Sequence, residues 1–160
     1  MKTIEIKSII NEYSSLEELS EVSKNLCNSA LEAAKTAYAP YSKFQVGAAI
    51  MLENGVVVKG SNQENAAYPS GLCAERVALF YANSTYPDQA VEAIAITAIH
   101  NGSQVENPIS PCGSCRQVIA ETKQRFNKKI KILLYSSSKI LEISDSDTLL
   151  PLSFVMDDSE

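Results

Sequence analysis

The stretch FQVGAAIMLENGVVVKG, residues 44–60, is the clearest indication of the fold. Two apolar runs, 44–52 and 56–60, flank Glu53, Asn54 and Gly55. Asn-Gly between apolar runs is the strongest short-range signal of a β-hairpin, because both residue types tolerate the positive φ angles that tight turns need. We therefore expect two antiparallel strands joined by a tight turn at this place.

Segments of helical and strand-like pattern lie on both sides of this hairpin. Before it, Ser14 and Ser15 are each followed three residues later by a glutamate, which is the capping-box signal of a helix start. Apolar residues then recur at helical spacing until Pro40, which disfavours continuation of the helix. After the hairpin we expect a helix over 73–83, a strand over 91–99, a helix over 111–125 and a strand over 130–135. This order predicts a three-layer α/β/α domain with a mixed sheet.

The composition is that of a globular chain of ordinary size. Of its 160 residues, 45% are apolar and 21% are charged, which excludes a disordered chain, a collagen-like chain and a disulfide-stapled mini-scaffold. The formal net charge is −5 and basic runs are lacking, so a nucleic-acid partner is not indicated. We expect a single domain over residues 1–160, in which residues 1–24 form an N-terminal extension of unknown role.

The chain carries no pattern that indicates a membrane partner. Its longest apolar runs are shorter than the roughly 18 residues that a membrane span needs, or are interrupted by charge. The opening MKTIEIKSIINEY has no continuous apolar core and no small-residue cleavage site of the kind that signal peptides have. We expect a cytoplasmic protein in a reducing compartment.

Four cysteines, Cys27, Cys73, Cys112 and Cys115, are unlike a disulfide framework in an intracellular chain of this length. Cys27 neighbours Leu26 on the first expected helix, and we interpret it as a small buried hydrophobic side chain. Cys112 and Cys115 form a C-x-x-C pair, which is typical of a redox dithiol or of half a zinc site.

Two short segments, CAER at 73–76 and PCGSCR at 111–116, stand at the expected starts of two helices. Helix N-termini favour negative charge and lower the pKa of a thiol. Cys112 and Cys115 share one helical face, and Cys73 supplies a third thiolate from another helix. Three protein ligands leave a fourth position on zinc open for water, which is the catalytic arrangement. Glu75 at the helix entry can lie beside that water without binding the metal, and can take and return its proton.

A closed structural site is the main alternative for the cysteines. It needs a fourth ligand, and His100 is the only histidine of the chain. His100-Asn101-Gly102 has the pattern of a strand end that enters a turn, which favours an exposed loop histidine instead. The redox alternative gives no reason for Cys73 and Glu75.

The spacing C-A-E…P-C-G-S-C is the three-cysteine form of the zinc deaminase signature, with a glutamate that does not bind the metal. The chain also resembles the small, homotetrameric zinc cytidine deaminases over residues 25–154. The matching pieces are YAPYSKF at 38–44, VGAA at 46–49, NQENAAYP at 62–69, GLCAER at 71–76, PCGSCRQV at 111–118, and LLP with Phe154 near the end. This family resemblance implies a mixed five-stranded sheet and one Zn²⁺ per chain, held by Cys73, Cys112 and Cys115.

The resemblance also implies how a nucleoside is held. Phe44 would stack on the pyrimidine, and the backbone around Ala66 would contact the base. Asn62 and Glu64 would bind the ribose hydroxyls, and their i, i+2 spacing places both side chains on one side of an extended segment. Glu75 would act as the catalytic acid and base and would also reach ring N3.

The remaining roles concern assembly and the thiolates. Tyr68 and Phe154 would complete active sites that are shared between neighbouring subunits of a homotetramer. Arg76 and Arg116 each follow a site residue, and donation from their guanidinium groups would offset the negative charge of three thiolates. The alternative for either arginine is an ion pair with a surface carboxylate.

We therefore expect zinc-dependent hydrolytic deamination of cytidine and deoxycytidine to uridine and deoxyuridine, an ammonia-releasing step of pyrimidine salvage. Two other functions stay open. One is deamination of a modified aminopyrimidine nucleoside, as in the related blasticidin S deaminases. The other is a non-catalytic zinc protein that binds nucleosides, against which Glu75 argues.

Overall fold

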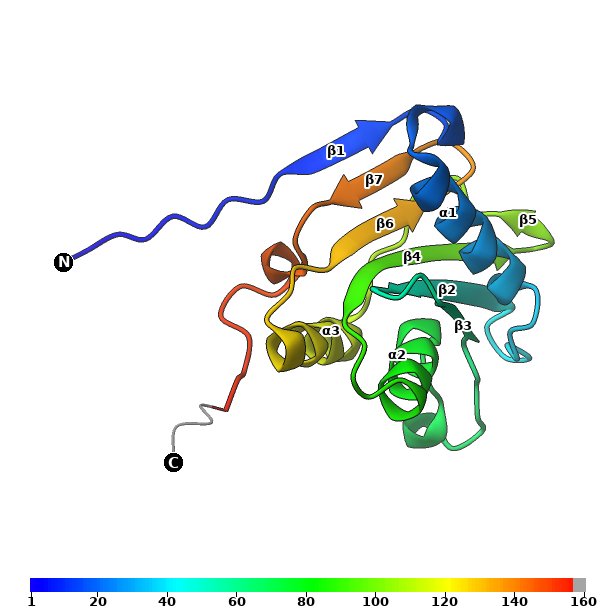
Figure 1. Cartoon of the computed structure of the whole chain (residues 1–160). Helices are drawn as coiled ribbons and strands as arrows, with labels where there is room; N and C mark the ends of the chain where they lie inside the picture. Colours follow the sequence, from blue (N-terminus) through cyan, green and yellow to red (C-terminus); the bar gives the residue numbers. More distant parts are fainter. Residues whose placement is uncertain (157–160) are drawn as a thin grey trace.

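A computed structural model describes residues 1–156, and its strands form one mixed seven-stranded sheet (Figure 1). The order across the sheet is β1-β7-β6-β4-β2-β3, and β5 pairs with the end of β4. Among the paired strands of residues 1–156, β4 and β6 run parallel, and all other pairs are antiparallel. The strands are β1 (Ile10–Tyr13), β2 (Phe44–Leu52), β3 (Val57–Ser61), β4 (Val91–His100), β5 (Ser103–Gln104), β6 (Lys131–Tyr135) and β7 (Ile140–Ile143).

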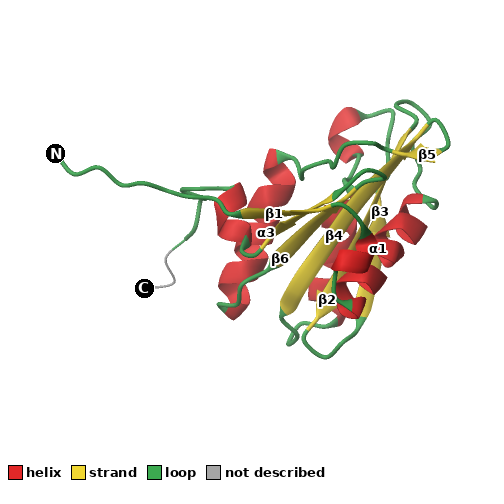
Figure 2. Ribbon diagram, turned by 90° about the horizontal axis from the view of Figure 1, so that it is seen from above, coloured by secondary structure: helices red, strands yellow, loops and turns green. Residues whose placement is uncertain are grey.

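Helices cover both faces of this sheet, so the predicted three-layer α/β/α architecture is confirmed (Figure 2). Helix α1 (Glu21–Ala34) packs on one face, and α2 (Ala74–Thr85) and α3 (Gly113–Phe126) pack on the other. Short 3₁₀ turns occupy η1 (Leu16–Glu18), η2 (Tyr68–Ser70) and η3 (Ser146–Leu149). No helix within residues 1–156 has the length and apolar character needed to cross a bilayer.

Successive residues of the central strand β4 show why the layers form. Side chains alternate between the two faces of a strand. Ala93 and Ala95 lie in the core under α1, whereas Ile94 and Ile96 lie in the larger core under α2 and α3. All four are buried, so β4 reads as an uninterrupted apolar run because both of its faces are covered.

Two glycines allow helices to approach the sheet backbone closely. A Cβ atom at Gly47 of β2 would lie 2.1 Å from the carbonyl oxygen of Ala30 in α1. A Cβ atom at Gly60 of β3 would lie 2.6 Å from the backbone nitrogen of Ala78 in α2. The second contact fixes the height of α2 above the sheet, and with it the position of the segment that starts at Cys73.

The hairpin predicted from residues 44–60 is confirmed. β2 and β3 pair antiparallel with Gly47 opposite Ser61 and Met51 opposite Val57. Gly55 adopts a φ of +81°, and the Asn54 side chain accepts a hydrogen bond from the Val56 amide at 3.0 Å. The turn therefore uses Asn and Gly as the sequence indicated.

The five strands that the resemblance implied are too few, because the sheet has seven; the patterns of the sequence indicated four of these and missed the three short ones. β1, β5 and β7 have four, two and four residues, which is too short for a period-2 pattern to stand out from its surroundings. β1 belongs to the N-terminal extension and becomes a strand through its antiparallel pairing with β7 at the sheet edge. The sequence by itself indicates only an extension of unknown role for this segment.

The start and end of the first helix also differ from the expectation. Ser15 and Glu18 form the predicted capping box, but it caps the single turn η1. The chain is extended at Leu19, and α1 begins at Glu21 with Ser20 as its N-cap. The helix ends at Ala34, because the chain beyond it turns away to pair at Tyr38 with residues after β3.

Candidate active site

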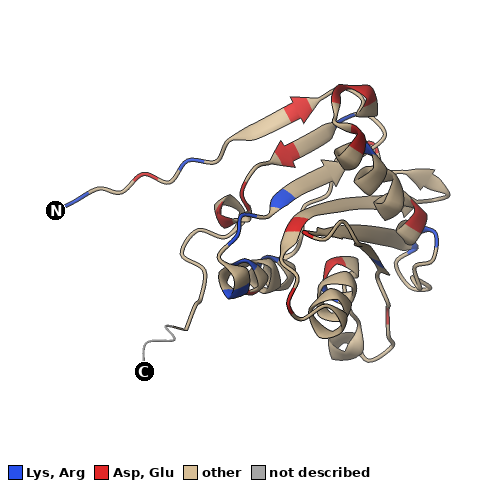
Figure 3. Ribbon diagram, in the orientation of Figure 1, with Lys and Arg blue, Asp and Glu red and all other residues tan. Residues whose placement is uncertain are grey.

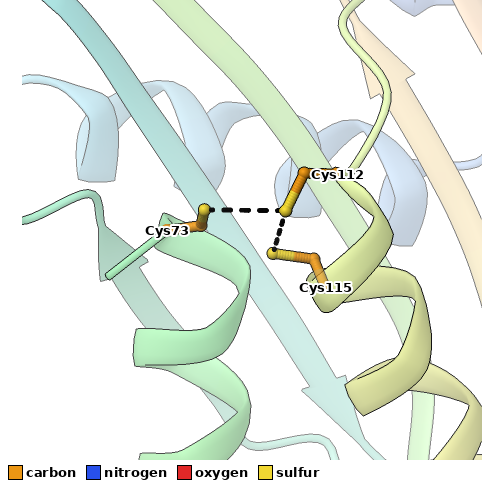
Figure 4. A group of neighbouring side chains, drawn as sticks. All are labelled: Cys73, Cys112 and Cys115. Atoms are coloured by element: carbon orange, nitrogen blue, oxygen red, sulfur yellow. Dashed lines mark hydrogen bonds between the residues drawn. The ribbon is translucent and has the colours of Figure 1, made fainter. Parts of the chain in front are cut away.

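Three cysteine side chains converge where α2 and α3 begin (Figure 4). The Sγ atoms of Cys73 and Cys112 are 3.8 Å apart, and those of Cys112 and Cys115 are 3.5 Å apart. All three sulfur atoms lie within 4.8 Å of one another. Two helices that are distant in sequence thus bring together a group of ligand atoms that one ion can bridge.

The local backbone explains how the sulfur atoms reach this point. Cys73 and Cys112 are the N-cap residues of α2 and α3, with extended φ/ψ values of −71°/152° and −67°/168°. Neither side chain caps its own helix, so both sulfur atoms stay available. Cys115 stands one turn into α3 and is buried. The positive end of the α2 dipole therefore faces the Cys73 thiol, which favours its thiolate form.

Arg76 supplies a positive charge to the same group. Its Nη2 atom donates to Cys73 Sγ at 3.6 Å, and its buried Nε has no hydrogen-bond partner within the described residues. Hydrogen bonding from Cys115, together with that from Arg76, lowers the pKa of the Cys73 thiol to about 5. Three soft sulfur donors with a guanidinium beside them fit Zn²⁺, which binds cysteine thiolates at about 2.3 Å.

Glu75 lies directly behind the thiols, in the first turn of α2, and only 5% of its surface is exposed. Burial raises the pKa of its carboxyl group, and the negative charge of Cys73 adds to this effect. A carboxyl group whose pKa is raised by burial is suited to take up and return a proton. Cys73 and Glu75 interact although they are two positions apart, because Cys73 is the N-cap residue and precedes the first helical residue.

Arg116 has different partners from Arg76. Its Nε donates to the Pro111 carbonyl at 2.8 Å, and its Nη1 donates to the Leu149 carbonyl at 2.9 Å. Both acceptors are backbone oxygens, and neither is a sulfur or a surface carboxylate. In this structure Arg116 ties the backbone just before Cys112 to the C-terminal segment.

A cavity of about 560 Å³ opens beside Cys73 and Arg76. Three of the residues that the family resemblance assigned to substrate, Asn62, Glu64 and Tyr68, line it. Tyr68 is 90% exposed and lines the cavity of its own chain. The volume suits a small molecule, whose sites commonly span about 300–1,000 Å³.

Asn62 and Glu64 point to the same side of an extended segment, as their spacing predicts. The Asn62 amide donates to the Phe44 carbonyl at 2.9 Å and accepts from the Val46 amide at 2.7 Å. The Glu64 carboxylate accepts from the backbone amides of Tyr41 and Ser42 at 2.9 and 3.3 Å. Both side chains therefore hold the chain that leads into β2.

Phe44 begins β2 on the face that carries α2 and α3, since Val46 two residues later packs in the core on that face. It is not among the residues that line the cavity. Its ring lies 5.7 Å, centroid to centroid, from that of His100, its partner across β2 and β4. His100 is exposed at the strand end and is not part of the thiol group, which removes the closed four-ligand alternative. Ala66 is exposed in the loop before η2.

Phe154 lies away from this cavity within one chain. Its side chain is 73% exposed, and its carbonyl accepts a hydrogen bond from Gln117 of α3 at 2.7 Å. Gln124, two turns further along α3, donates to the Met156 carbonyl at 3.3 Å. The tail thus runs along α3 of its own chain.

Sequence reasoning did not single out Ser42, whose hydroxyl contacts Glu64 and the Phe44 amide. The available signal was weak, because a serine in a turn bonds nearby backbone in many proteins. It also did not single out Gln117 and Gln124, whose i, i+7 spacing on one face of α3 was the only indication.

Comparisons with known proteins agree with this site. Residues 20–130 match the family described as the cytidine and deoxycytidylate deaminase zinc-binding region. The chain is 38% identical over 133 residues to a cytidine deaminase of Halalkalibacterium halodurans, covering 83% of this chain and 94% of the relative. It is 41% identical over 127 residues to a cytidine deaminase of Sporosarcina psychrophila, covering 79% and 87%.

A solved structure gives the same result for the fold. The cytidine deaminase of Burkholderia pseudomallei superposes with a TM-score of 0.70 at 36% identity, covering 81% of this chain and 97% of that one. The matched region includes both helix starts that carry the thiols. The chain therefore belongs to the cytidine and deoxycytidylate deaminase family, and the thiols of Cys73, Cys112 and Cys115 form a group that can hold a zinc ion.

Proposed function

We propose that this protein hydrolyses cytidine and deoxycytidine to uridine and deoxyuridine with release of ammonia. One observation carries the proposal: the buried carboxyl group of Glu75 interacts with Cys73 and Cys115, two of the three thiols that can hold one metal ion. The relatives named cytidine deaminase, which match nearly their whole length, support the same substrate class.

Zn²⁺ with three thiolate ligands and a fourth open position activates water for attack at neutral pH. The role of this chain is to hold and move the protons. Glu75 takes one proton from the attacking water while the water oxygen bonds to C4 of the pyrimidine, and it delivers this proton to ring N3. Glu75 then carries the second proton of that water, which is now on the C4 hydroxyl group, to the 4-amino group. The C4–N4 bond breaks, and ammonia leaves.

The other residues bind and orient the nucleoside. Asn62 and Glu64 stand at the cavity wall, where they would accept and donate hydrogen bonds to the sugar hydroxyls. Phe44 would stack on the base, and the backbone at Ala66 would contact its edge. Arg76 keeps the Cys73 sulfur negatively charged, since it already donates to that atom.

We further propose that the working form is a homotetramer with shared active sites in which Tyr68 and Phe154 serve neighbouring subunits. Large apolar side chains are exposed on this chain at Tyr68, Phe154, Phe80 and Tyr81, at 90, 73, 48 and 56%. Exposed apolar patches on a protein surface often mark contacts with another protein. We place the protein in the cytoplasm, where a reducing environment keeps cysteine thiols free to bind metal.

Charge distribution supports a small substrate over a nucleic acid. Basic residues are found on α3 and at the start of β6, and acidic residues on the neighbouring η3 and β7 (Figure 3). Lys123 pairs with Asp145 at 2.8 Å, and Lys131 pairs with Glu142 at 3.6 Å. Positive charge that is neutralised in this way does not supply the phosphate contacts that nucleic-acid binding requires.

An absorbance assay of the zinc-loaded protein with cytidine, deoxycytidine, CMP and adenosine tests the proposal. We expect turnover of both nucleosides, no turnover of adenosine, and a strong preference for cytidine over CMP. Within residues 1–156, Arg76 is the one lysine or arginine that lines the cavity and could receive a 5′-phosphate. Equal kcat/KM values for cytidine and CMP would overturn the substrate assignment. Zinc retention without turnover of any of them would identify a non-catalytic binding protein.

A further inference from the structure

The turn that leads into β2 depends on Glu64. Besides the amides of Tyr41 and Ser42, the Glu64 carboxylate accepts a short hydrogen bond from the Ser42 hydroxyl. The Ser42 hydroxyl is the main cause that lowers the pKa of the Glu64 carboxyl group below its ordinary value. The carboxylate is therefore held in its charged form by groups of this turn alone.

The Ser42 hydroxyl also contacts the backbone of Phe44. Its Oγ donates to Glu64 and at the same time accepts from the Phe44 amide at 3.0 Å. The residue between them, Lys43, has a φ of +57°, a left-handed conformation that non-glycine residues seldom adopt. Such a conformation persists where surrounding contacts impose it, and the hydroxyl bridge across Lys43 is such a contact.

Asn62 holds the other side of the same residue. Its amide donates to the Phe44 carbonyl, so both backbone polar groups of Phe44 are bound by side chains of the turn and of the 62–64 segment. Phe44 is only partly buried, so core packing alone does not fix its ring. These hydrogen bonds hold its backbone, beside the pairing of β2 with β4 and the contact of its ring with His100.

We propose that Ser42 is a positioning residue, which couples Glu64 to the Phe44 backbone and so orients the Phe44 ring for the substrate base. The inference rests on the proposed function for its kinetic consequence, but the contact exists without substrate. Glu64 then has two tasks. A carboxylate offers about four lone-pair sites, and the turn uses three of them, which leaves one for a sugar hydroxyl.

The first test is kinetic, with the zinc-loaded Ser42→Ala variant. Without the hydroxyl, Ser42 no longer joins the Glu64 carboxylate to the Phe44 amide, so we expect KM for cytidine to rise about tenfold or more, with kcat within about threefold of wild type. Ser42→Thr, which keeps the hydroxyl, should restore KM. Ser84→Ala is the matched control, because the Ser84 hydroxyl only contacts the Tyr81 carbonyl in α2, and it should leave both constants unchanged.

The second test separates the turn from the sugar. The KM penalty of Ser42→Ala should be equal for cytidine and for 2′,3′-dideoxycytidine, which lacks both ring hydroxyls. The rise in KM caused by Glu64→Gln should be smaller with the dideoxy substrate but should not disappear. The part of that rise that comes from losing the contact with Ser42 remains. A Glu64→Gln penalty that disappears completely, or a Ser42→Ala variant with wild-type KM, would overturn the positioning role.

The third test needs no turnover. Hydrogen exchange at the Phe44 amide, followed by NMR without substrate, should be faster in Ser42→Ala than in wild type, whereas amides of β4 should be unchanged. Wild-type protein that leaves cytidine intact would refute the proposed function, while this exchange experiment would still decide the role of Ser42. Unchanged exchange at Phe44 would show that the hydroxyl bridge does not hold the turn.

Discussion

At the scale of single residues, the site depends on four consecutive positions from Cys73 to Arg76. Cys73 stands before the first helical residue, so its sulfur faces the same side as Glu75 although the two are only two positions apart. Arg76 follows and turns back to donate to the Cys73 sulfur. A helix start thus presents a metal ligand, a buried acid and a cation from one short segment.

Replacing the buried acid should remove turnover but leave the metal in place. Groups that act as general acid and base typically contribute about 10²–10⁴-fold to the rate, so we expect Glu75→Gln to lose that much in kcat. Zinc content and circular dichroism should match wild type. The exposed Glu92→Gln on β4 is the control and should keep full activity. A loss of less than about tenfold would show that another group moves the protons.

Removing thiols should remove the metal. Wild-type protein should carry about one zinc per chain, and Cys73→Ala combined with Cys112→Ala should carry almost none by elemental analysis. Cys27→Ala is the matched control, because burial raises the pKa of the Cys27 thiol to about 12 and keeps it protonated. Zinc that stays in the double variant would mean that the ligands are elsewhere.

At the scale of elements, the site exists because two helices begin at adjacent points over the sheet. Small residues set that arrangement. Ala74 and Ala78 of α2 lie so close to β3 that only glycine fits at position 60. α3 is carried by the parallel crossover from β4 to β6, which places its start next to that of α2.

Adding one methyl group at Gly60 should displace α2. The new Cβ would be 2.6 Å from the Ala78 nitrogen and 2.7 Å from the Ala74 carbonyl oxygen, both of which are backbone atoms that cannot turn aside. Overpacking typically costs about 1–3 kcal/mol, and we expect Gly60→Ala to lower the free energy of unfolding in urea by that amount. Activity should fall as well, since Cys73 and Glu75 move with the helix. Gly113→Ala, with open space around its Cβ, should be neutral, and equal stability of the two variants would contradict this account.

At the scale of the whole molecule, the N-terminal arm extends from the body (Figure 1). Both this arm and the C-terminal segment up to Met156 expose apolar side chains. Ile4, Ile6 and Ile9 of the N-terminal arm are 76, 55 and 74% exposed. Leu152 of the C-terminal segment is 95% exposed. The tail is fastened to its own α3 only through backbone carbonyls, so its side chains are left for other contacts.

Deleting residues 150–160 should weaken assembly and catalysis together. Burying a phenylalanine side chain stabilises by about 1.5–3 kcal/mol, and the proposed tetramer would lose that contribution from Phe154 at each shared site. The truncated chain should keep its zinc, because the three thiols lie outside the deletion. Light scattering and a deamination assay measure the two losses. A fully active monomer would show that one chain completes its own active site.

The sequence alone determined the features that depend on interactions between residues close together in the chain. The Asn54-Gly55 turn and the capping box at Ser15 are set by neighbours a few positions away, and both are present. The alternation of helices and strands, the helix starts at the thiols and the place of Glu75 also followed from local pattern. The meeting of the three thiols was predicted because their residue type and spacing are those that a zinc site demands.

The tertiary structure decided what depends on distant partners. β1 becomes a strand because it pairs with β7 across a sequence separation of 131 residues, and nothing in its own composition requires that. Arg116 reaches Leu149, 33 positions away, rather than a sulfur. Ser42 meets Glu64 across 22 positions. Local preferences are encoded in short windows, whereas the partners of a strand edge, a guanidinium or a hydroxyl are set by which segments the packed core brings side by side.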